Sequence, residues 1–327
     1  MALISGSMVR SAVPSGQVPN KSFWTRLKLF LDKNGTYMLM ALPGAALIFI
    51  FAYAPMPGII IAFIDLKFNL GPWASPWVGL DNFGYLIATP LTGRVLFNTL
   101  FMNAMFIITG TMGAIGVALL MNEVHGKFRA RIYQSAMFFP NFISIVVVSY
   151  FVFAFLSTDE GLVNNLLKSI GVEPMQWYSS PEYWPVILII VSIWKGVGVS
   201  SIIYLATMVG INPEFYEAAK IDGASKLDQI RYITLPLLVP VITILTLLAI
   251  GRIFYADFGL FFIVTRNTPA LYPTTDVIDT FVYRSLIQLN DVGMSAAAGL
   301  AQSVIGFILV IISNMVVRKV DPEKSLF

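Results

Sequence analysis

Six long apolar stretches restrict this sequence to folds that cross a membrane. They occupy residues 38–63, 95–121, 132–156, 185–209, 237–264 and 294–317. A helix rises about 1.5 Å per residue, so about 20 apolar residues are enough to cross a hydrocarbon core of about 30 Å. The chain is also 57% hydrophobic and only 12% charged, whereas soluble domains carry about 25% charged residues. The sequence therefore predicts an all-α integral membrane protein with six transmembrane helices.

The lysines and arginines outside the spans are distributed unevenly. Fourteen lie before the first span, after the last, or in the second and fourth connections, and five lie in the other connections. An excess of basic residues marks the cytoplasmic side of a membrane protein. We therefore expect both termini in the cytoplasm, with an N-terminal segment over 1–36, a transmembrane domain over 37–318 and a tail over 319–327.

Several function classes lack the residues that they require. Because the chain has no cysteine, disulfides, thiol nucleophiles and Cys-ligated metals are excluded. The one histidine, His125, lies in a predicted loop, where a solvated side chain is the ordinary interpretation. No phosphate-binding glycine loop, H-E-x-x-H or G-x-S-x-G motif is present. The sequence therefore predicts a protein that is not an enzyme, holds no metal and, with a net charge of only +3, contacts membrane lipid rather than nucleic acid.

One short polar segment, residues 212–236, separates the fourth and fifth spans. Asn212 is a good N-cap for a first short helix, and Gly223 can take the positive φ that ends it. Ser225 and Asp228 form a capping box that starts a second short helix. We therefore expect a helix–turn–helix along the cytoplasmic face, which we call the polar hairpin. These features alone leave open whether it is a capped connector or a docking element.

The polar hairpin also carries a longer pattern, E-A-A-x3-G-x9-I-x-L-P. Its proline is expected to end the second short helix before the fifth span. This pattern resembles the EAA loop of permease subunits in binding-protein-dependent ABC importers, and the resemblance extends over most of the chain. The matching positions are Glu217, Ala218, Ala219, Gly223, Ile233, Leu235 and Pro236.

The resemblance implies a set of partners. A second permease, giving a heterodimer, would complete the translocation path, two ATPase subunits would hold ATP and Mg, and an extracytoplasmic solute-binding protein would deliver the cargo. This chain would bind no cofactor and would lie in a prokaryotic plasma (inner) membrane. The first short helix would be the coupling helix, with Glu217 near a basic group of the ATPase and Gly223 at the turn. The implied coupling residues are Phe215, Glu217, Ala218, Ala219, Asp222, Gly223, Leu235 and Pro236.

Two further stretches point to a class of cargo. Residues 254–286, FYADFGLFFIVTRNTPALYPTTDVIDTFVYRSL, look like the polysaccharide-type branch of sugar permeases. The earlier YAPMPGIIIAFIDLKF and WVGLDNF are similar to the same branch. The resemblance therefore implies import of an oligosaccharide such as an aldouronate.

Ionisable residues within the predicted spans are candidates for the solute path, because charges at that depth are costly. Lys195 lies in the fourth span, and Arg252 and Asp257 lie in the fifth, five residues apart and about 140° around a helix. Arg252 and Tyr255 would share a face and offer a donor and a ring to a sugar. Two buried bases suggest an acidic oligosaccharide, although pairing with acids on other spans or on the partner permease is the alternative. Weaker candidates are Asn141, Trp194 and Gln302.

Other interpretations make different demands on the sequence. A permease for a simple sugar or a sugar phosphate would share every feature of the polar hairpin. An ion-coupled secondary carrier should show repeat symmetry with interrupted helices and has no need of a docking loop. A membrane-embedded enzyme would need clustered catalytic side chains in the spans, and a scaffold would not need the EAA pattern.

Overall fold

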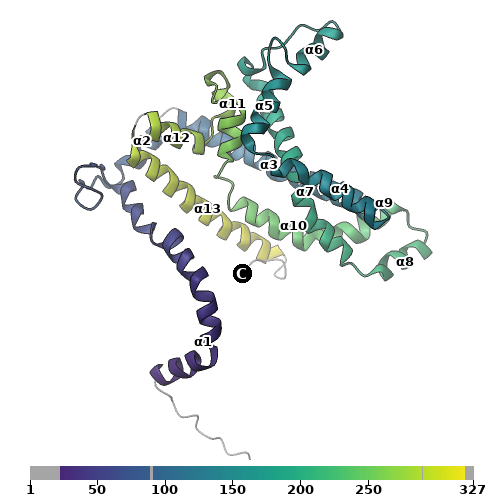
Figure 1. Ribbon diagram of the computed structural model, residues 1–327, viewed down its shortest axis with the longest axis horizontal. Helices are drawn as coiled ribbons and strands as arrows, with labels where there is room; N and C mark the ends of the chain where they lie inside the picture. The colour runs from purple at the N-terminus through teal and green to yellow at the C-terminus, as the bar shows by residue number, and fades with distance from the viewer. Residues whose placement is uncertain (1–22, 89–90, 289, 321–327) are drawn as a thin grey trace, which may run out of the picture. The chain divides into compact units, whose positions relative to one another are not determined.

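The computed structural model describes residues 23–88, 91–288 and 290–320, so the parts of the predicted N-terminal segment and tail at 1–22 and 321–327 lie outside it. All regular elements in the described ranges are helices (Figure 1). Five of them are long and apolar enough to cross a membrane, or six if one bent pair counts as a single span. The chain divides into two compact units, residues 1–58 and 59–327.

The described part of the first unit is one long helical segment that changes its winding. α1 (Phe23–Ile48) is followed by a π turn, η1 (Phe49–Tyr53), and a 3₁₀ segment, η2, that begins at Met56 and ends at Phe63 in the second unit. The described part of the predicted lead-in is therefore helical from Phe23. Pro55, which has no N–H, lies between the π and 3₁₀ segments and accounts for the change of winding there.

A closely packed pair of helices forms the centre of the second unit. α3 (Leu91–Asn122) packs along α7 (Trp184–Val209), which match the predicted second and fourth spans. Gly113 on α3 permits the approach, since a Cβ atom there would lie 3.3 Å from a methyl group of Val197. With α10 (Leu235–Ile250) the pair encloses a small core, made of Ala114, Ala118, Tyr204, Met208 and Leu238.

The third span is broken, which differs from the predicted continuous helix over 132–156. α4 (Lys127–Phe142) and α5 (Ile145–Leu156) meet at a bend of 93°, and α5 turns away from α4 (Figure 1). Ser144 is extended and caps α5 by accepting from Val147 N–H at 3.3 Å. An N-cap inside an apolar run starts a new helix, so hydropathy alone could not locate the break.

The predicted fifth span over 237–264 is also wrong in its second half. The helix ends at Ile250, and residues 251–257 form turns before a π segment, η6 (Gly259–Val264). α13 (Val292–Val320), the sixth span, passes directly beside the end of α10. The approach is so close that a Cβ atom on Gly306 would lie 3.0 Å from Gly251 O. The apolar sequence continues through the turn, which is why length and hydropathy predicted a helix.

The other elements outside the polar hairpin are short, and most of them lie near a second core, whereas α2 packs on α13. They are α2 (Asp81–Ala88), α6 (Leu162–Ser169), η3 (Trp177–Ser179), η4 (Pro181–Tyr183), η7 (Pro269–Leu271), α11 (Tyr272–Thr275) and α12 (Ile278–Gln288). This core joins α5 and the start of α7 to η6 and the segment after it. Its members are Met102, Val148, Val152, Leu156, Trp184, Leu188, Val191, Leu260, Phe261, Val264, Leu271 and Val277.

Candidate functional site

The first helix of the polar hairpin is fixed at both ends by local hydrogen bonds. α8 (Pro213–Ile221) begins where Glu214 N–H donates to the Asn212 side chain at 3.1 Å. It ends in a Schellman motif, in which Ala224 N–H reaches back to Ala219 O at 2.9 Å. Gly223 takes a φ of 79° in this turn, a conformation that costs other residues about 1–2 kcal/mol.

The second helix of the hairpin runs without a break into the fifth span. α9 (Lys226–Gln229) starts at the expected capping box and continues through a π turn, η5 (Ile230–Thr234), into α10. The expectation that Pro236 ends this helix is therefore wrong. In the widened turn Leu235 N–H donates five residues back to Ile230 O, which leaves room for a proline that has no N–H to donate.

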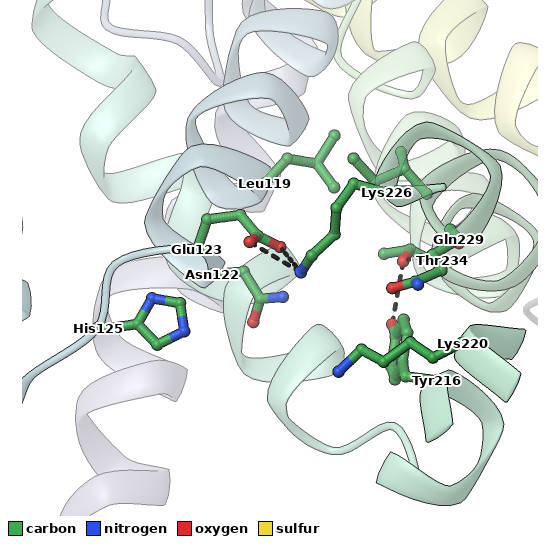
Figure 2. Close-up of a pocket in the computed structure, with 10 residues that line it drawn as sticks. Leu119, Asn122, Glu123, His125, Tyr216, Lys220, Lys226, Gln229 and Thr234 are labelled. Carbon is green, nitrogen blue, oxygen red and sulfur yellow. Dashed lines mark hydrogen bonds and ion pairs between the residues drawn. The ribbon is translucent and has the colours of Figure 1, made fainter. Parts of the chain in front are cut away.

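The inner side of the hairpin is tied to itself and to α3 around a cavity of about 180 Å³ (Figure 2). The Tyr216 and Thr234 hydroxyl groups lie 3.0 Å apart, which joins α8 to the π turn. Lys226 Nζ lies 2.9 Å from both carboxylate oxygens of Glu123, directly after the end of α3. The hairpin is therefore joined within itself and contacts the end of α3.

The outer side of the hairpin is an apolar groove of about 420 Å³. Phe215 and Tyr232 are 54% and 67% exposed there. Glu217 is exposed on the same short helix and makes no hydrogen bond or ion pair within the described residues. A groove with exposed rings and a free carboxylate at its side is suited to receive another protein. Its lining is Phe215, Ala218, Ala219, Asp222, Tyr232, Ile233, Pro236 and Leu237.

A second cavity, of about 400 Å³, lies between α3, α7, α10 and the turn that follows α10. Two of the predicted path residues, Arg252 and Tyr255, line it, although they lie on a turn rather than on a shared helix face. Four polar residues of the lining were not among the predicted path residues: Asn103, Thr111, Ser200 and Tyr204. Their helical spacing, eight residues apart on α3 and four on α7, is a signal that could have placed them on one face.

Side chains from two neighbouring helices hold this turn. Asn103 on α3 donates to Ile253 O at 2.8 Å, and Gln302 on α13 donates to Phe254 O at 2.8 Å. The Tyr255 hydroxyl lies 2.6 Å from Ser303 Oγ. Non-helical backbone at membrane depth is tolerated where protein satisfies it or where it lines a cavity, and here both apply. Arg252 is exposed and pairs with no carboxylate of the described residues.

The other predicted path residues do not line this second cavity between α3, α7 and α10, which we call the central cavity. Lys195 and Asn141 do meet, but Lys195 Nζ donates to the backbone oxygen of Asn141 at 3.1 Å and to Ile143 O at 2.8 Å. Trp194 is 42% exposed on α7. Asp257 caps η6 by accepting from Leu260 N–H at 3.0 Å, so its predicted place within the fifth helix is wrong.

Within the described residues, no three His, Asp or Glu side chains form a group that could hold a metal ion. The described residues form two separate features, a cavity between α3, α7 and α10 and an apolar groove on the polar hairpin. The cavity offers hydrogen-bonding groups, a guanidinium and aromatic rings, and the groove offers exposed apolar side chains.

Comparison with known proteins places the chain among transport permeases. Residues 110–322 match the family described as binding-protein-dependent transport system inner membrane component. The polygalacturonan/rhamnogalacturonan transport system permease protein YteP of Bacillus subtilis is 35% identical over 91% of this chain and 92% of its own length. Protein LplB of the same organism is 33% identical over 90% and 92%.

Solved structures agree with this placement. A chain from the crystal structure of a bacterial ABC transporter involved in the import of the acidic polysaccharide alginate has a TM-score of 0.82 and 34% identity, covering 90% of this chain and 99% of its own. A chain from the complex of that type of transporter with an alginate pentasaccharide-bound periplasmic protein has a TM-score of 0.81 and 33% identity, over 92% and 98%.

These relatives are transport subunits rather than enzymes, and ATP hydrolysis belongs to the ATPase partner. The family match covers more than half of the chain, and the predicted resemblance is confirmed. The chain belongs to the family of binding-protein-dependent transport system inner membrane components, and it is a multi-pass permease subunit of an ABC importer.

Proposed function

We propose that this permease imports an acidic oligosaccharide and that Arg252 contacts its carboxylate groups. The observation that carries the proposal is the unpaired guanidinium of Arg252, among the described residues, on the wall of the central cavity. An arginine within a membrane is costly unless it pairs or faces water, and the carboxylate of a passing sugar would supply a charge-assisted partner. The Tyr255 ring on the same wall offers the apolar face of a sugar a surface to pack on.

Two similar proteins support an acidic cargo. One is named for polygalacturonan and rhamnogalacturonan, and the other is a transporter involved in import of the acidic polysaccharide alginate. The second candidate is a neutral oligosaccharide. It is supported by the similarity to the arabinooligosaccharides transport system permease protein AraP of Bacillus subtilis, which is 28% identical over 87% of this chain. The free charge of Arg252 favours the acidic cargo over the neutral one.

The proposed path requires other subunits. This chain supplies one wall of the passage, a second permease supplies the opposite wall, and the solute-binding protein delivers the oligosaccharide. The excess of basic residues at the hairpin, at the second connection and at both ends of the chain supports a cytoplasmic position for all four.

The polar hairpin is the proposed contact with the ATPase. The groove around Phe215 provides apolar contact area, and Glu217 provides a charge that fixes the register of a basic partner group. Because the hairpin continues directly into α10 and is tied to α3 through Glu123, its displacement would move two walls of the central cavity. Two ATPase subunits would bind the ATP and Mg that drive this movement, and this chain would bind neither.

The cargo proposal is tested with the reconstituted complex and its binding protein. ATP hydrolysis is measured with oligogalacturonate and with a neutral oligosaccharide of equal length. We expect stimulation by the acidic oligomer, a loss of uptake of about tenfold or more in Arg252→Gln, and partial retention in Arg252→Lys. Stimulation by the neutral sugar alone, with wild-type uptake in Arg252→Gln, would establish the second candidate instead.

The coupling proposal is tested by comparing two glutamates of α8. Glu217→Gln should lower solute-stimulated ATP hydrolysis while the complex still assembles, whereas Glu214→Gln, at the exposed start of the same helix, should behave like the wild type. Equal stimulation in Glu217→Gln and the wild type would remove the assigned role of the carboxylate.

A further inference from the structure

The break in the third span leaves backbone groups that need partners. The last carbonyl groups of a helix have no donor within the helix, and a membrane interior supplies no water to replace one. α4 ends at Phe142. Lys195 Nζ donates to Asn141 O at 3.1 Å and to Ile143 O at 2.8 Å, so one ammonium group from α7 reaches both sides of the helix end.

This contact also accounts for a charge within the fourth span. The ion pairs among the described residues join Lys67 to Asp65, Lys226 to Glu123 and Arg284 to Asp276, and none includes Lys195. The carbonyl end of a helix carries a partial negative charge that attracts a cation. The α4 terminus therefore gives the ammonium of Lys195 the partner that no described carboxylate supplies.

Lys195 also stands between the two apolar cores of the second unit. On its N-terminal side, α7 contributes Trp184, Leu188 and Val191 to the core that contains α5. On its C-terminal side, α7 contributes Tyr204 and Met208 to the core shared with α3 and α10. α7 is continuous through both cores, whereas the third span bends between α4 and α5.

We propose that Lys195 is a positioning residue that fixes the angle between α4 and α5. Within the second unit, the break is then a hinge between the part that packs around α5 and the part that packs around α10 and the polar hairpin, while α3 and α7 run through both cores. Lys195 holds this hinge on α7 without touching the solute. The role in transport rests on the proposed function, but the role at the break does not.

Hydrogen–deuterium exchange on the assembled complex tests the role at the break. Val147 N–H and Val148 N–H donate to Ser144 in the first turn of α5. In Lys195→Met these amides should exchange about tenfold or more faster than in the wild type, because the turn loses its anchor. Lys195→Arg, which keeps the charge and the donors, should restore slow exchange. Ile190→Met, at an exposed position on the same helix, is the matched control and should leave exchange unchanged.

Two results would overturn the proposal. Slow exchange in Lys195→Met would show that the ammonium does not hold the break. Slow exchange together with a raised half-saturating solute concentration would make Lys195 a solute ligand instead. If the Met variant does not assemble, Lys195→Gln, which keeps a donor but loses the charge, is compared with Lys195→Arg; exchange should be faster in the Gln variant, and equally slow exchange in the two would overturn the role of the ammonium charge. Transport is measured in parallel, so that altered exchange without altered transport would reject only the hinge's part in the cycle.

Discussion

Gly198 on α7 is the position where the structure makes the sharpest statement about helix packing. A Cβ atom there would lie 2.6 Å from the carbonyl carbon of Met137 on α4 and closer still to its oxygen. Carbon atoms in good contact are about 3.5–4.0 Å apart, so Gly198→Ala would force α4 and α7 apart by about 1 Å. The neighbour in the clash is backbone, which cannot rotate away as a side chain can.

The expected cost follows from two opposing effects. Overpacking of this kind costs about 1–3 kcal/mol, while replacing glycine by alanine in a helix returns up to about 1 kcal/mol. Gly196→Ala is the matched control, because no atom lies within 4 Å of its Cβ position on the same helix. Gly198→Ala should therefore be less stable than Gly196→Ala by about 1–3 kcal/mol.

The assay is thermal melting of the two purified variants in the same detergent. At about 2–4 °C per kcal/mol, the melting temperature of Gly198→Ala should lie about 2–12 °C below that of Gly196→Ala. Equal melting temperatures for the two variants would refute the reasoning, because the close approach of α4 to α7 would then not exist in solution.

Three smaller predictions concern the hairpin and a connection between spans. Gly223→Ala should reduce solute-stimulated ATP hydrolysis more than Gly223→Asn does, because asparagine tolerates a positive φ better. An equal loss of hydrolysis in the two variants would argue that the positive φ at this turn does not matter for coupling. A double-mutant cycle on Glu123 and Lys226 should give an interaction energy of only about 0.2–1 kcal/mol, because their side chains are 47% and 62% exposed. The exchanged pair, Glu123→Lys with Lys226→Glu, should melt at a higher temperature than either single variant, and failure to do so would count against the contact. Burial raises the pKa of Tyr178 from 10.0 to about 12, so stability present below pH 10 should fall as the pH rises toward 12, and melting of Tyr178→Phe should lack this alkaline loss.

The elements that could be predicted from sequence are those whose signals are local. The second, fourth and sixth spans coincide closely with α3, α7 and α13, because each apolar run there is one continuous helix long enough to cross a membrane. The polar hairpin follows the expected caps at Asn212 and Ser225, since capping depends on residues within one turn. The π turn before Pro236 was not predictable in the same way, because it continues the helix through a residue that ordinarily stops one.

The two errors in the spans have a shared physical cause. Hydropathy measures whether a segment can lie in lipid, and it gives no information on whether the backbone there is helical. At both breaks, polar side chains of other helices replace the missing helical donors: Lys195 at the end of α4, and Asn103 and Gln302 at the turn after α10. A single sequence does not show which distant side chain meets which carbonyl, so the breaks depended on contacts that only the fold provides.

The same contacts explain why polar residues within spans are poor guides to a solute path. Lys195, Asn103 and Gln302 each satisfy backbone groups, which is the least costly use of a donor in lipid. Arg252 differs because the described residues leave its charge unpaired while the cavity exposes it. If donors that complete the backbone are structural and donors left over face the cargo, then Gln302→Leu should destabilise the turn after α10 while Arg252→Gln should impair uptake with the fold intact.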